Sequence, residues 1–209
     1  MIKEERVAEF LARVASSAPT PGGGSVGAVA AATGAALLAM VARLTEGRPG
    51  FEAVSGRMRE IAERADAERA ALLDLADSDA TAFDDVMTAF KLPKATGDEK
   101  AARSAAIQTA FSAAADVPLV VARRSSALLN EVAEVIAEGN SDAASDGMSA
   151  AAMLHAGVLS ALANVSINAA SLKDAEAASL LRSEAAELSA SAGRALEAAR
   201  AAFEKRTAR

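Results

Sequence analysis

The sequence predicts an all-α fold: a single-domain bundle of about six or seven helices with one very long central helix. Of the 209 residues, 52% are hydrophobic but only 3% are aromatic, so the apolar fraction is mostly alanine. Alanine, together with abundant leucine, glutamate and arginine, favours helices. The length suits one substantial core, so we expect residues 1–209 to form one domain. Because small side chains bury little area each, a shared subunit surface would add stability, and we expect a homodimer.

Hydrophobic spacing and helix breakers define the first two helices. Residues 2–17 carry apolar side chains three to four positions apart, which predicts an amphipathic helix. The segment 19–25, with two prolines and three glycines, ends it. Residues 26–45 then form a helix that is apolar all round and is therefore surrounded by other helices. A membrane span is disfavoured there, because the apolar stretch is rich in alanine and shorter than the roughly 20 strongly apolar residues that a bilayer needs.

The segment 51–92 contains no helix breaker and predicts one long helix. Positions seven residues apart form a seam of the coiled-coil type along it. Asp79 lies on this seam, between apolar neighbours such as Leu75 and Val86. Since the aspartate side chain is too short to reach past them into water, we expect burial to raise the pKa of Asp79.

Two further helices are predicted before residue 140. Asp98 and Glu99 place negative charge in the first turn of a helix, as the helix dipole favours. Pro118 interrupts that helix and begins the next one, since proline is favoured at the first helical position. Gly139 closes the second of the two.

The helix that follows runs from a cap at Asn140 to about residue 172 and is mostly apolar. One of its faces nevertheless carries polar side chains at steps of three and four: Asp146, Ser160, Asn164 and Asn168. Such groups either bond to neighbouring helices or contact a polar ligand, and the spacing is consistent with both. The last helix, 174–205, is amphipathic, and we expect it to serve packing only.

The segment 19–25 reads Pro-Thr-Pro-Gly-Gly-Gly-Ser and precedes a helix directly. The first N–H groups of a helix have no partner within it, so a glycine-rich entry can present them to an anion or a polar ring. Ser25 could instead be an ordinary capping residue. The residues alone leave both interpretations open.

Composition excludes several classes of function. A net charge of −6 without a basic tract argues against nucleic-acid binding. The absence of cysteine excludes disulfides and thiolate chemistry, and His155, the single histidine, is a poor basis for a metal site. No nucleotide-binding fingerprint is present. The charged N-terminus lacks the apolar segment of a signal peptide. We therefore expect a cytoplasmic protein that binds no metal, nucleotide, nucleic acid or membrane.

Several blocks then occur in a characteristic order: 19–25, Asp-Ser-Asp-Ala-Thr-Ala-Phe at 77–83, Leu-Pro-Lys at 92–94, Val-Pro-Leu at 117–119, Gly-Asn at 139–140, Ser-Asp at 145–146 and Asn-Val-Ser-Ile-Asn at 164–168. In this combination, over residues 7–172, the chain closely resembles the cyclodeaminase domain of formiminotransferase-cyclodeaminase and its stand-alone bacterial relatives, which include methenyltetrahydrofolate cyclohydrolases. The resemblance implies a dimeric all-α bundle with a tetrahydrofolate derivative as substrate, bound near the Pro-Gly loop.

The resemblance also implies a catalytic aspartate, the second of the block 77–83, which is Asp79 here. In cyclodeaminases, N10 attacks the formimino carbon on N5 and ammonia leaves; in cyclohydrolases, water opens the 5,10-methenyl ring to 10-formyltetrahydrofolate. Because no formiminotransferase domain is attached, we expect a cyclohydrolase. The alternatives are a cyclodeaminase and, in a different class, a non-catalytic helical dimer derived from the family.

The expected substrate-binding residues come from the same blocks and from the stretch after the second helix: Pro21, Gly22, Gly23, Gly24, Ser25, Arg48, Asn140, Asp146, Asn164 and Asn168. That stretch departs from the relatives, which carry several lysines where this chain has only Arg48. If it meets the glutamate tail of the folate, binding of polyglutamates would be weaker here, and Arg43, Lys91 and Lys94 are the alternative cations.

Overall fold

The computed structural model describes residues 1–208, which contain helices and no strand. In chain order the elements are η1 (Ile2–Glu4), α1 (Val7–Val14), α2 (Gly23–Arg43), α3 (Ser55–Phe90), α4 (Gly97–Glu138), η2 (Ser141–Ala143), α5 (Ala144–Ala170) and α6 (Ala175–Thr207). The all-α prediction is confirmed. The longest helix is α4, with 42 residues, and α3 has 36.

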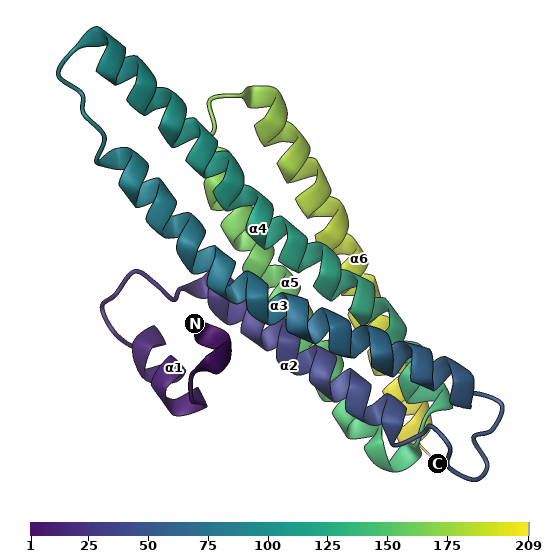
Figure 1. Cartoon of the computed structure of the whole chain (residues 1–209). Helices are drawn as coiled ribbons and strands as arrows, with labels where there is room; N and C mark the ends of the chain where they lie inside the picture. The colour runs from purple at the N-terminus through teal and green to yellow at the C-terminus, as the bar shows by residue number, and fades with distance from the viewer. Residues whose placement is uncertain (209) are drawn as a thin grey trace.

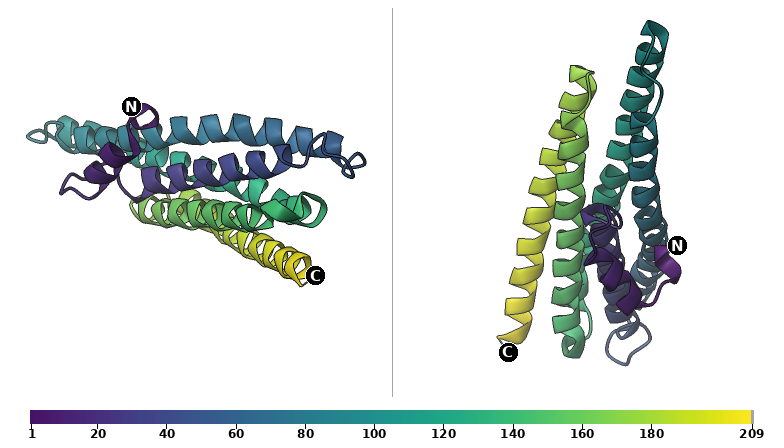
Figure 2. Two further views of the ribbon diagram at one scale, coloured as in Figure 1. Left: turned by 90° about the horizontal axis from the view of Figure 1, so that it is seen from below. Right: turned by 90° about the vertical axis from the view of Figure 1, so that its left-hand side faces the viewer.

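Helices α2, α3, α4 and α5 form an elongated core, and α6 packs on α4 and α5. Figure 1 shows the short α1 lying outside this core, and Figure 2 shows α6 as the layer farthest from α3. The connector between α3 and α4 forms a tip that extends well past the start of α2 (Figure 1). Beyond that start the bundle therefore continues without α2.

Helix α2 touches α5 backbone to backbone. A Cβ added at Gly34 would lie 2.9 Å from the Ala150 carbonyl oxygen, and one at Gly157 would lie 2.7 Å from the Ala31 Cβ. By length and composition, α2, α4 and the stretch Ser141–Ala170 could each cross a membrane, and 61%, 39% and 44% of their apolar windows are buried within the bundle. For α2, close packing among other helices accounts for its composition, as predicted.

Two helix boundaries near the N-terminus differ from the prediction. The expected helix 2–17 is divided, because Arg6 has an extended backbone between η1 and α1. Helix α2 begins at Gly23 instead of residue 26, so that Gly23 and Gly24 belong to its first turn. The η1 segment is tied to α3: the Ile2 amide donates to Asp77 Oδ1 at 2.6 Å.

The prediction that Pro118 separates two helices is wrong. Helix α4 is continuous from Gly97 to Glu138, with Pro118 buried inside it. A proline in a helix interior costs about 3 kcal/mol. Neighbouring α4 side chains such as Leu119 and Leu129 are almost fully buried, and each buried leucine contributes about 1.5–3 kcal/mol. Packing of α4 on α3, α5 and α6 thus offsets the cost.

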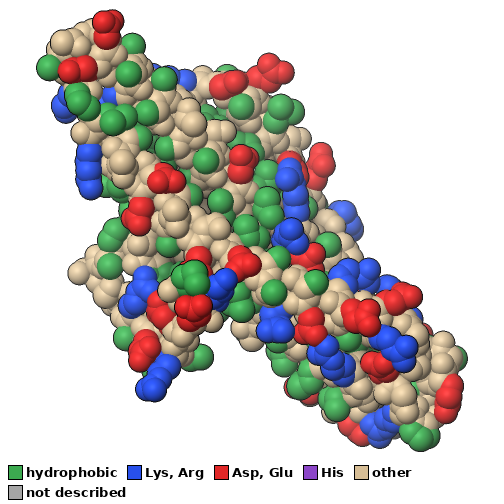
Figure 3. All heavy atoms as spheres, in the orientation of Figure 1, with side chains coloured by type: hydrophobic (Ala, Val, Ile, Leu, Met, Phe, Trp, Pro, Cys, Tyr) green, Lys and Arg blue, Asp and Glu red, His purple; other side chains and the backbone are tan. Residues whose placement is uncertain are grey.

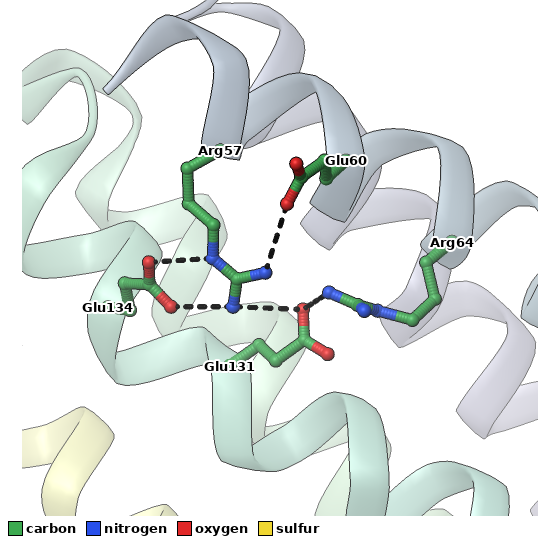
Figure 4. A network of polar contacts seen from close by, with 5 residues as sticks. All are labelled: Arg57, Glu60, Arg64, Glu131 and Glu134. Carbon is green, nitrogen blue, oxygen red and sulfur yellow. Dashed lines mark hydrogen bonds and ion pairs between the residues drawn. The ribbon is translucent and has the colours of Figure 1, made fainter. Parts of the chain in front are cut away.

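A network of ion pairs joins α3 to α4 at the end opposite the tip (Figure 4). The Arg57 guanidinium donates from two nitrogens to the Glu134 carboxylate, both at 2.9 Å, and Arg64 donates to Glu131 at 2.7 Å. Glu60 lies 3.7 Å from Arg57. Exposed pairs of this kind contribute at most about 1 kcal/mol each, so their main effect is to fix the register of the two helices.

Candidate active site

A cavity of about 410 Å³ opens where α2 begins. Helices α3, α4 and α5 all contribute to its walls, and the loop before α2 closes one side. The cavity thus occupies the place that a longer α2 would fill. Figure 3 shows charged side chains gathered at the opposite end of the molecule, near the C-terminus. None of the described residues that line the cavity is a lysine or an arginine.

Asp79 reaches the cavity from α3 and is held by Ser25 of α2. The Ser25 hydroxyl donates to Asp79 Oδ2 at 2.9 Å, and the Ser25 backbone N–H donates to the same carboxylate. Ser25 itself is 0% exposed. The carboxylate therefore lies against the N-terminus of α2, where the free N–H groups and the helix dipole favour negative charge.

Burial raises the pKa of Asp79 above the ordinary aspartate value, and the two hydrogen bonds from Ser25 lower it only in part. The pKa shift expected from the seam of apolar residues is therefore confirmed. An aspartate with these properties can take up and release a proton closer to neutral pH than an exposed one.

The glycines of the loop have distinct roles. A Cβ added at Gly24 would lie 2.1 Å from Asp79 Oδ1, so only glycine lets the carboxylate approach the backbone this closely. At Gly23 the nearest atoms would be 3.8 Å away, which leaves ordinary room. The Ser160 hydroxyl donates to the Gly23 carbonyl at 2.6 Å and so ties the loop to α5.

Asn164 and Asn168 form the polar wall on α5. The Nδ2 group of Asn164 donates to the Ser160 carbonyl at 2.9 Å, and that of Asn168 donates to the Ala114 carbonyl at 2.7 Å. Because a carbonyl can only accept, both amides must present Nδ2 to the protein. Each Oδ1 is then left as a free acceptor on a side chain that lines the cavity, and neither accepts a hydrogen bond from a donor within residues 1–208.

Replacing Ser25 with alanine is expected to lower turnover roughly tenfold, because it removes one hydrogen bond to a charged group. It also removes a bond that lowers the pKa of Asp79. A carboxylate that acts as a base is active above its pKa, so the acid limb of the pH–rate profile moves to higher pH. The profile of kcat against pH checks this. Ser125→Ala, which also removes a buried hydroxyl, is the control that leaves the limb in place.

The structure brings together part of the predicted site. Gly22, Gly23, Gly24, Asp79, Asn164 and Asn168 line the cavity. Pro21 is buried and shapes the loop without lining the cavity, and Ser25 contacts Asp79 instead of the cavity space.

Arg48, Asn140 and Asp146 lie at the other end of the bundle, so their assignment to the same site as Asp79 does not hold within one chain. The 21 residues of α2 separate its two ends by about 30 Å. Arg48 pairs with Asp142 at 3.4 Å, and the buried Asn140 caps η2. Asp146 lies 18 positions before Asn164 on α5, about 27 Å away.

The apolar wall of the cavity was not predicted from the sequence. It consists of large side chains on α3, α4 and α5: Phe83, Met87, Phe90, Phe111 and Ile167. Phe90 and Phe111 meet edge to face with centroids 6.0 Å apart. The sequence did carry a pattern for this wall, since several of these residues repeat at helical spacing. The same pattern is typical of ordinary core packing and therefore does not identify a cavity.

Comparison with known proteins places these features in context. A family model described as formiminotransferase-cyclodeaminase matches residues 6–187. The chain is 42% identical over 175 residues to a methenyltetrahydrofolate cyclohydrolase from Methylorubrum extorquens, covering 83% of this chain and 84% of that protein. It is 40% identical to the formimidoyltransferase-cyclodeaminase of Sus scrofa, covering 79% of this chain but only 30% of that one. A crystal structure of formiminotetrahydrofolate cyclodeaminase from Thermotoga maritima matches with a TM-score of 0.88 and 33% identity, over 98% of both chains.

Proposed function

The chain belongs to the formiminotransferase-cyclodeaminase family, and we propose that it is an enzyme of folate one-carbon metabolism that hydrolyses 5,10-methenyltetrahydrofolate to 10-formyltetrahydrofolate. The Methylorubrum extorquens relative, which matches at both high identity and high coverage, carries the name of this activity. The observation that carries the proposal is the Asp79 carboxylate, held by Ser25 with its pKa raised and opening onto a cavity of suitable size.

The charge of the substrate suits this cavity. The methenyl bridge between N5 and N10 is a cation, and it needs acceptors and negative charge around it. Asp79 and the Oδ1 atoms of Asn164 and Asn168 supply them, and the described lining contains no cationic side chain. Phe83, Phe90 and the rest of the apolar wall can pack against the rings of the folate.

Asp79 can serve both proton transfers of the hydrolysis. As the oxygen of water bonds to the methenyl carbon, the carboxylate accepts a proton from it. The resulting hydroxyl loses its proton as the carbonyl forms and the bond from carbon to N5 breaks, and N5 receives a proton from Asp79. The balance is one water consumed and one proton released. In this scheme neither a metal nor a nucleotide takes part.

A cyclodeaminase is the second candidate, favoured by the structural similarity to the Thermotoga maritima protein. There N10 would attack the formimino carbon on N5, and the aspartate would carry the N10 proton to the formimino nitrogen. With one further proton that nitrogen would leave as ammonia, which gives the methenyl cation. One acid at one carbon can serve either reaction, so the cavity geometry is compatible with both.

We also propose that the protein acts as a cytoplasmic homodimer. Large apolar side chains are exposed on α5 and α6, including Leu159 at 47% and Leu180 at 65%. Within one chain, Arg48, Asn140 and Asp146 lie about 30 Å from the start of α2. If they bind folate together with Asp79, they do so from a second copy of the chain.

The test is the ultraviolet absorbance of 5,10-methenyltetrahydrofolate with purified protein, run beside its formation from 5-formiminotetrahydrofolate. Accelerated decay above the spontaneous rate supports the cyclohydrolase. Formation without accelerated decay assigns the cyclodeaminase instead. If neither signal appears and no folate binds, the proposal fails and the non-catalytic dimer is favoured.

A further inference from the structure

Pro118 leaves one backbone carbonyl at the cavity without its helical hydrogen bond. In an α-helix the N–H of residue 118 would donate to the carbonyl of residue 114. Proline has no N–H, so the Ala114 carbonyl lacks its helical partner. Ala114 lines the cavity, and its carbonyl oxygen accepts the hydrogen bond from Asn168 Nδ2 at 2.7 Å.

This hydrogen bond determines which end of the Asn168 amide is held by the protein. A side-chain amide carries donors on one end and an acceptor on the other. Binding of Nδ2 to Ala114 fixes the donor end against α4 and leaves Oδ1 as the free acceptor of a side chain that lines the cavity. With an N–H at position 118, the Ala114 carbonyl would divide its two lone pairs between that donor and Asn168 Nδ2, and its hold on the Asn168 amide would be weaker.

We propose that Pro118 is a positioning residue for the substrate site, acting through Ala114 and Asn168 so that Asn168 Oδ1 accepts a hydrogen bond from an N–H group of the reduced pterin. This inference rests on the proposed folate substrate. A tetrahydropterin carries N–H donors at N3, N8 and the 2-amino group, which are the groups that an amide oxygen acceptor recognises. Asn164 adds a second acceptor from the same helix, but its Nδ2 bonds to Ser160 and does not depend on Pro118.

The destabilisation of α4 by a proline in its interior is consistent with a role of Pro118 beyond packing. A proline in a helix interior is destabilising, and alanine at this position would restore a backbone hydrogen bond. Pro118 is 20 residues or more from both ends of α4, so it neither starts nor ends the helix. An explanation through Asn168 gives the destabilising residue a function.

The experiment compares Pro118→Ala with wild-type protein. We expect KM for 5,10-methenyltetrahydrofolate to rise about three- to tenfold, as for the loss of one neutral hydrogen bond, with kcat within twofold and Tm not lowered. A merely structural proline would not give this combination. A KM within twofold of wild type, or a rise in KM accompanied by a lower Tm, overturns the proposal.

Double variants separate the path through Asn168 from a general effect on α4. Pro118→Ala should have no further effect on KM in an Asn168→Leu background, because the positioned group is already absent. In an Asn164→Leu background, the matched control, the two effects should multiply. Multiplication in both backgrounds would show that Pro118 acts by another route.

A spectroscopic measurement keeps this inference apart from the proposed function. In ¹⁵N NMR of the unliganded protein, the side-chain NH₂ of Asn168 is expected to shift and lose exchange protection in Pro118→Ala, while that of Asn164 stays unchanged. An unchanged Asn168 signal overturns the inference even if wild-type protein is active. Absence of folate turnover in wild type would instead overturn the proposed function.

Discussion

Replacing Asp79 with asparagine is expected to reduce turnover by at least ~100-fold and to leave the fold intact. The amide is nearly isosteric with the carboxylate and can still accept the hydrogen bond from the Ser25 hydroxyl, but it cannot take up a proton. Because burial raises the pKa of Asp79, the ionised form destabilises the folded state at neutral pH relative to an unshifted acid. Tm should therefore be unchanged or higher in Asp79→Asn at pH 7, and this difference should disappear at pH values below the ordinary aspartate pKa.

The measurement is single-wavelength decay of the methenyl substrate, with thermal unfolding recorded at two pH values. Asp84→Asn is the matched control, since Asp84 is an exposed aspartate on the same helix and does not line the cavity. It should retain wild-type turnover. Near-normal turnover in Asp79→Asn would remove Asp79 from the proton transfers.

Replacing Gly24 with alanine is expected to give the second large effect. The new Cβ would lie 2.1 Å from Asp79 Oδ1 and 2.6 Å from Asp79 Cγ, so the carboxylate must move away from the α2 N-terminus. A displacement of about 1 Å at a catalytic group can cost on the order of 100-fold in rate. We expect a comparable loss of kcat, together with a lower Tm.

Two other glycines make the comparison specific. Gly193→Ala adds a methyl group where no atom lies within 4 Å and should raise Tm slightly without changing turnover. A Cβ at Gly23 has ordinary room, and Gly23 lines the cavity. Gly23→Ala should therefore raise KM and leave Tm nearly unchanged. If Gly24→Ala matched Gly193→Ala in turnover, the close approach at Gly24 would have no catalytic role.

Asp79 could be identified from the sequence because the evidence for it is local. A short acidic side chain on an apolar seam of one helix must be poorly solvated, wherever the neighbouring helices lie. The structure adds the partner, Ser25, which is 54 positions away in the chain. Neither sequence interpretation of Ser25 anticipated this contact: the N-cap of α2 is Gly22, and Ser25 bonds to a carboxylate from another helix.

The rest of the site could not be predicted, because sequence periodicity shows which residues share a helix face but not how far they lie from the cavity. Asp146 and Asn164 share a stripe on α5, but a stripe says nothing of where along the helix a cavity opens. Pro118 shows a similar limit. Local rules end a helix at proline, whereas tertiary packing here retains the helix and a side chain from α5 takes over the free carbonyl.

Because α2 starts late, the stability of the folded chain is expected to depend on whether a ligand occupies the cavity. Helices α3, α4, α5 and α6 continue past Gly23, whereas α2 does not (Figure 1). The apolar side chains that line the cavity therefore have no α2 beside them. A molecule seated there acts as the missing core segment. Because binding to the folded state alone adds RT ln(1 + [L]/Kd) to the unfolding free energy, the bundle is expected to resist unfolding and proteolysis better with a ligand in the cavity than without one.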